Sequence, residues 1–166
     1  MRVVNRGFWF FFLVSFIMFW IAMLIGLIFG YYIDFQMEYS KQNSSLNTID
    51  GFYDILFNNL KVFFIILLGT FIWKIPSVLN LVYNGGILGL VFYGLYRDGL
   101  LYLSLAPILA HGVLEITAFL FGASIAFGGC EFIKNHKRVT ALLLLFSVVL
   151  LVAAAYIETF ISILLF

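Results

Sequence analysis

Three residues of this chain have the types and the spacing to do chemistry within an apolar environment. His111 and Glu115 are four positions apart in a long apolar segment, so on a helix they share one face and can pair. Glu158, in the last apolar segment, is the natural third member across a helix interface. An ionised carboxyl group at the centre of a bilayer costs about 2.5–3.5 kcal/mol. We therefore expect these side chains to face one another inside a helical bundle.

Further polar residues and glycines extend this candidate cluster. Asn84 lies at a similar depth in its own apolar segment, and we group it with the ionisable residues as a buried polar cluster. A secondary set of positions comprises Asn58, Asn59, Gly85, Gly89 and Gly112.

Three roles are open for the cluster. A structural clamp is favoured, because interhelical hydrogen bonds are a normal packing device in membranes. Proton or substrate handling is the second, because ionisable residues at membrane depth are candidates for function. A metal or hydrolytic centre is the least expected, since a metal site needs at least three ligands and His111 with Glu115 supplies two. The sequence thus predicts no metal, no cofactor and no catalytic residue.

The composition requires membrane-spanning helices to position these side chains. Hydrophobic residues make up 64% of the 166 positions, charged residues 10%, and the mean hydropathy is +1.13. A soluble domain needs about a quarter charged residues to cover its surface. We therefore predict an all-α membrane protein with the lipid bilayer as its solvent, forming a single transmembrane domain over residues 1–166. No basic stripe exists to bind a nucleic acid.

About five apolar segments match the roughly 20 residues that span a bilayer core. They cover residues 8–33, 55–73, 75–96, 99–133 and 139–166. The first is too long for a cleavable signal segment, so we expect a retained helix. As one helix, segment 99–133 would measure about 52 Å against a core of roughly 30 Å. We predict a broken or re-entrant segment near residues 99–112, where Pro107 and Gly112 lie.

The basic residues predict the orientation. If the N-terminus lies in the cytoplasm, twice as many Lys and Arg residues lie inside as outside, which is the usual bias. The inner set is Arg2, Arg6, Lys74, Lys134, Lys137 and Arg138, and the outer set is Lys41, Lys61 and Arg97. We expect a multi-pass protein of the cell membrane with its N-terminus in the cytoplasm and its C-terminus outside.

Two glycine pairs indicate where helix backbones approach closely. Gly26 and Gly30 are four apart in the first span, and Gly85 and Gly89 are four apart in the third. Small residues at this spacing let helices pack tightly. Packing within the bundle is favoured over a homodimer contact.

The polar residues also form a familiar series along the chain. Its elements are Asn58-Asn59, then Asn84-Gly85 with Gly89, then His111-Gly112-Val113-Leu114-Glu115, then Ala154-Ala155-Tyr156-Ile157-Glu158. Over about residues 50–160 this series resembles the stage II sporulation protein M family of small bacterial and archaeal membrane proteins. The His-Gly-x-x-Glu element is its most specific part. Ala110 and Thr117 stand where that family often has proline.

The resemblance implies a membrane subunit without catalytic chemistry of its own. Sporulation members belong to an envelope complex with cell-wall hydrolases, where the membrane subunit is thought to be a scaffold. Similar short members occur with ATP-binding subunits in circular bacteriocin clusters, where they are implicated in maturation or export. We favour a subunit of an export or maturation assembly for a secreted peptide such as a circular bacteriocin. Other membrane subunits and an ATP-binding subunit are the implied partners.

The alternatives fall into three classes. One is the scaffold subunit of a cell-envelope complex of the sporulation type. Another is an intramembrane enzyme or proton-coupled carrier that uses His111, Glu115 and Glu158. The third is an immunity protein that shields its host by binding a toxin.

Overall fold

The structure is a computed structural model that describes residues 2–36 and 49–161. Its elements are α1 (Arg2–Ile33), α2 (Ile49–Leu68), α3 (Ile75–Arg97), α4 (Leu101–Asn135), α5 (Lys137–Tyr156) and the π-helical turn η2 (Ile157–Ile161). The described part contains five helices that are long and apolar enough to cross a membrane. The prediction of an all-α membrane protein with about five spans is therefore confirmed.

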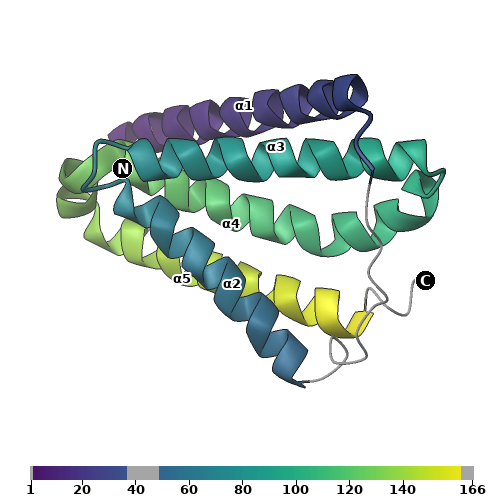
Figure 1. The fold of residues 1–166 in the computed structure, drawn as a ribbon. Coiled ribbons are helices and arrows are strands. Elements are labelled where there is room, and N and C mark those ends of the chain that lie inside the picture. The colour runs from purple at the N-terminus through teal and green to yellow at the C-terminus, as the bar shows by residue number, and fades with distance from the viewer. Residues whose placement is uncertain (1, 37–48, 162–166) are drawn as a thin grey trace.

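The helices form a bundle in which α4 is central. Figure 1 shows α1 and α3 lying side by side, with α4 beneath them, α5 beyond α4, and α2 crossing in front of α4 and α5. Within the described part, α4 packs against each of the other helices and against η2. The most deeply buried side chains of the core include Phe19 of α1, Phe63 and Ile66 of α2, Leu81 of α3 and Leu151 of α5, so all four of the other long helices contribute to it. Any polar group on the inner side of α4 therefore meets several helices at once.

Glycines hold α1 against α3. A Cβ atom added to Gly89 would collide with the backbone carbonyl of Met23, and one added to Gly26 would collide with that of Gly86. A Cβ atom added to Gly85 would likewise collide with the carbonyl of Phe19. The expectation that these small residues serve packing within the bundle is confirmed.

The second span differs from its predicted bounds at both ends. Helix α2 begins at Ile49, before residue 55, because Asp50 in the first turn suits the positive end of the helix dipole. It ends at Leu68, before residue 73. The chain then turns through Trp73 and Lys74, whose φ angles of 50° and 65° are left-handed and cannot continue a helix. Helix α3 begins at Ile75, and Pro76 lies in its first turn, where proline is well tolerated.

The break in the long fourth segment lies elsewhere than predicted. Helix α4 continues through Pro107 and Gly112, so the re-entrant segment expected near residues 99–112 is not a gap in the helix. Pro107 is close to the helix start and removes a single backbone hydrogen bond there. The non-helical residue is Gly129, with φ 69° and ψ −172°. The segment is indeed not one straight helix, but a glycine near its end breaks it.

The first and last spans also differ from their predicted bounds. Helix α1 begins at Arg2, before the apolar run that starts at residue 8. The last span is α5 continued by η2, and residues 162–166 of the predicted segment lie outside the described residues. An ion pair joins the ends of α1 and α3, with Arg97 Nε 3.0 Å from Asp34 Oδ1.

Candidate functional site

A hydrogen bond between helices α2 and α4 forms the centre of the candidate site. The side-chain amide Nδ2 of Asn59, on α2, donates to the carboxyl oxygen Oε1 of Glu115, on α4. Asn59 is 7% exposed, whereas its neighbour Asn58 is exposed on the outside of α2. The two asparagines therefore lie on different sides of α2, and of the two only Asn59 faces the interior of the bundle.

Glu158 reaches the same place from the last helix. It lies in η2, where the helix widens into a π-helical turn, a feature that often occurs at functional sites. The hydroxyl group of Thr159 in this turn donates to the carbonyl of Ala155 at 2.8 Å. From this turn the Glu158 carboxyl group interacts electrostatically with Glu115 and with His111.

The structure therefore brings four predicted residues together: Asn59, His111, Glu115 and Glu158. They come from α2, α4 and η2, and we call them the acid-pair cluster. The three ionisable side chains are half-buried. Two carboxyl groups close together in an apolar setting cannot both be ionised cheaply, so the pair needs a proton or a nearby cation such as a charged imidazole. Chemically, the cluster is suited to hold and release a proton.

The remaining predicted residues lie elsewhere. Asn84 Nδ2 donates to the Asn80 carbonyl at 2.8 Å and to Asn80 Oδ1 at 3.1 Å, so its hydrogen bonds stay within α3. These bonds do not join Asn84 to the acid-pair cluster with which the sequence analysis grouped it. Gly85 and Gly89 face α1, as described above, and are packing residues.

Two features of the site were undervalued or missed in the sequence. Asn59 was placed in the secondary set, although it shares a spacing of four and seven with Phe63 and Ile66, the buried side chains of α2. That periodicity distinguishes it from Asn58. The π-helical turn at Glu158 has no comparable signal, because nothing in Ala154 to Thr159 departs from an ordinary apolar helix.

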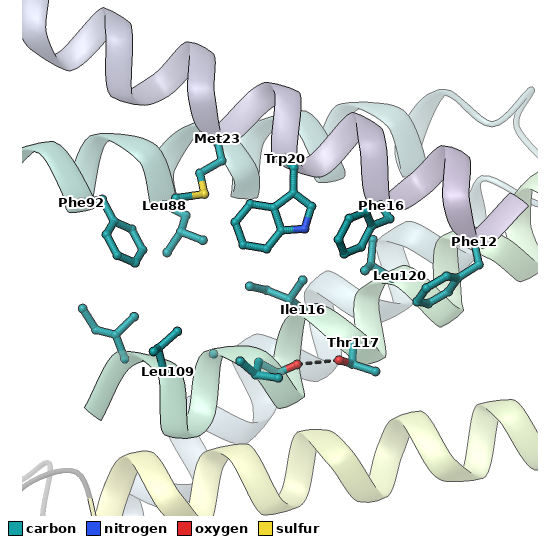
Figure 2. Close-up of a pocket in the computed structure, with 13 residues that line it drawn as sticks. Phe12, Phe16, Trp20, Met23, Leu88, Phe92, Leu109, Ile116, Thr117 and Leu120 are labelled. Atoms are coloured by element: carbon teal, nitrogen blue, oxygen red, sulfur yellow. Dashed lines mark hydrogen bonds between the residues drawn. The ribbon is translucent and has the colours of Figure 1, made fainter. Parts of the chain in front are cut away.

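A second feature lies on the neighbouring face of α4. An apolar cavity of about 190 Å³ separates α4 from α1, with α3 at its back. Figure 2 shows Phe16 and Trp20 of α1 pointing across it toward Ile116 of α4. The Thr117 hydroxyl group donates to the carbonyl of Val113 at 2.7 Å, so it is satisfied within its own helix. Gly112 also lines this cavity, and a Cβ atom there would meet nothing within 4 Å.

Known proteins resemble this chain over most of its length. The sequence profile of the Stage II sporulation protein M family matches residues 8–163. An uncharacterized protein of Methanocaldococcus jannaschii is 33% identical over 132 residues, which are 68% of this chain and 71% of that protein. No solved structure matches the chain significantly. The family match includes all four residues of the acid-pair cluster, and the chain belongs to the Stage II sporulation protein M family.

Proposed function

We propose that this chain is a membrane subunit, without catalytic chemistry of its own, of an export or maturation assembly for a secreted peptide. Family membership supports the membrane-subunit part of this proposal. The export role rests on the resemblance to short family members found beside bacteriocin precursors and ATP-binding subunits. A scaffold role in a cell-envelope complex is the alternative within the same class.

The observation that best supports the proposal is the position of the two carboxyl groups of Glu115 and Glu158. Glu115 on α4 and Glu158 on η2 lie close together, and Asn59 ties Glu115 to α2. In this proposal, a proton bound by either carboxyl group removes the repulsion between them and so keeps α4 and η2 together. Its loss leaves two like charges in an apolar surround, which push the elements apart. Such a junction gives the bundle two arrangements, as a subunit that couples to its partners requires.

The same observation favours one second candidate, a proton-coupled carrier. Here the acid pair and His111 pass a proton along the bundle while a substrate crosses. This version differs from the first because it needs no partner chain to move the substrate.

A complementation experiment tests the first proposal. The gene is deleted in its host and restored as wild type, Glu115→Gln, Glu158→Gln or Asn84→Ala, and secreted peptides are measured by mass spectrometry. We expect both glutamine variants to abolish secretion of the mature peptide at normal membrane abundance, since glutamine keeps the shape and removes the titrating group. Asn84→Ala, whose partner lies in its own helix, should secrete normally.

Two outcomes would overturn these ideas. If abundance of the glutamine variants falls in step with secretion, the cluster is a structural clamp and the proton role is wrong. If the purified chain alone translocates a peptide into liposomes, it needs no partners and the carrier replaces the subunit.

A further inference from the structure

The apolar cavity beside α4 is the inner end of a longer groove. Helices α1 and α4 touch at one end, where the rings of Phe12 and Phe121 lie 5.4 Å apart between centroids. Beyond this contact the two helices are separated by the cavity, and Leu88 and Phe92 of α3 form its back. The groove is therefore closed at the Phe12 end.

A second cavity continues the groove toward the ends of α1 and α3. Its volume is about 610 Å³, and it shares Phe92 with the first cavity. One side of α1 lines both, from Phe12 to Tyr31. From Trp20 to Tyr31, eleven helical steps extend about 16 Å at 1.5 Å each, which is about half of the roughly 30 Å bilayer core and thus the depth of one leaflet.

The lining changes character along this length. The lining of the inner cavity is almost wholly apolar and includes phenyl rings, aliphatic side chains, Trp20 and Met23, and the Thr117 hydroxyl group is satisfied within α4. The outer cavity carries four tyrosines, Tyr31, Tyr32, Tyr93 and Tyr96. The ion pair between Arg97, which follows Tyr96, and Asp34, which lies two residues after Tyr32, is near these tyrosines in the sequence. Tyrosine side chains are typical of the head-group level of a membrane.

The shape and the polarity select one kind of occupant. A transmembrane helix of another chain is about 10–12 Å across with its side chains. It is too bulky to enter an inner cavity whose volume is about 190 Å³. A short stretch of one flexible hydrocarbon chain is narrow enough for it. A molecule with such a chain and a polar end matches the change from apolar side chains to tyrosines.

We propose that this groove binds one phospholipid of the bilayer. Its acyl chain lies between Trp20 of α1 and Ile116 of α4, and its head group lies beside the hydroxyl groups of Tyr31 and Tyr96. Gly112 leaves room for the chain, because a side chain there would occupy the open space of the inner cavity.

Fluorescence of Trp20 tests this site. In a Trp9→Phe, Trp73→Phe background Trp20 is the remaining tryptophan, and a phospholipid with brominated acyl chains is titrated into protein in mild detergent. We expect quenching that saturates at one lipid per chain. Gly112→Leu should weaken this binding by about tenfold, because its side chain occupies the open space that the acyl chain would fill.

A matched control separates a site from ordinary lipid contact. With Trp20→Phe and Leu24→Trp, the reporter lies on an exposed position of α1 that does not line the groove. Its quenching should rise with lipid content and show no saturation at one lipid. Equal behaviour of the two reporters, or unchanged quenching of Trp20 in a Gly112→Leu protein of normal helical content, would overturn the proposal.

Native mass spectrometry gives a test without any variant. The wild-type chain released from mild detergent should carry one phospholipid mass. A bare chain, or a bound polypeptide that protects Trp20 from the brominated lipid, would show that a phospholipid is not the occupant.

Discussion

The amide of Asn59 donates a hydrogen bond to the carboxyl group of Glu115 across 56 positions of the sequence. This bond links α2 to α4 inside the bundle and leaves the second carboxyl group, that of Glu158, as the neighbour of Glu115. The amide donor thus orients one member of the acid pair while the other comes from a different helix.

Removing the amide donor should destabilise the bundle. We expect Asn59→Ala to lower the free energy of unfolding by about 1–2 kcal/mol, because Glu115 loses its interhelical donor. Asn58→Ala is the matched control, since Asn58 is exposed, and should change stability by less than about 0.5 kcal/mol. Unfolding in detergent titrated with a denaturing surfactant measures both. If the two variants lost equal free energies of unfolding, the assignment of Asn59, and not Asn58, to the buried side of α2 would be contradicted.

A methyl group at the contact between α1 and α3 should have a large effect. Gly89→Ala is expected to cost about 1–3 kcal/mol, because its Cβ atom collides with the Met23 carbonyl. The control is Gly86→Ala on the same helix, where the nearest atom is the Ala22 carbonyl at 4.0 Å. Thermal unfolding in detergent compares the two proteins. If Gly86→Ala proves the more harmful, the face of α3 that packs on α1 has been misassigned.

The break near the end of α4 depends on a backbone conformation that glycine tolerates. Gly129→Ala should lose about 1–3 kcal/mol, since φ 69° with ψ −172° is strained for any side chain. Gly112→Ala lies in a regular helical part with open space around it and should gain up to about 1 kcal/mol. The same unfolding measurement applies. A stable Gly129→Ala protein would mean that α4 can run straight.

The orientation in the membrane can be measured with two equally exposed positions. Trp73, in the turn after α2, and Tyr102, at the start of α4, are both 90% exposed. In a Cys130→Ser background, a membrane-impermeant maleimide added to intact cells should label Tyr102→Cys and not Trp73→Cys. This follows from a cytoplasmic N-terminus, which places Lys74 inside. Labelling of Trp73→Cys instead would place the N-terminus outside.

The number of helices could be predicted because a span is defined by apolar length, which the sequence states directly. The bounds of α2 could not, because a helix can extend through polar residues such as Asp50 beyond the membrane core. Pro107 led us to predict the break in α4 near residues 99–112, whereas the helix is interrupted at Gly129. The conformation of Gly129 was hidden because glycine identity alone does not reveal a positive φ.

The candidate site was predictable only in part. The spacing of His111 and Glu115 fixed their common face, and the cost of burying a charge indicated that Glu158 needed neighbours. Which asparagine joins them depends on the rotation of α2, which Phe63 and Ile66 set by packing. Asn84 was grouped with the cluster by depth alone, and depth does not specify the side of a helix.

The close pairing of α1 with α3, through Gly26 and Gly89, has a consequence for biogenesis. The first span leaves the ribosome well before its glycine-matched partner, since all of α2 is synthesised in between. During translation the side of α1 that contacts α3 must therefore remain exposed to lipid, or bound to the insertion machinery, until the third span has been inserted. A mutation that pushes α1 and α3 apart should therefore first slow the assembly of the nascent chain.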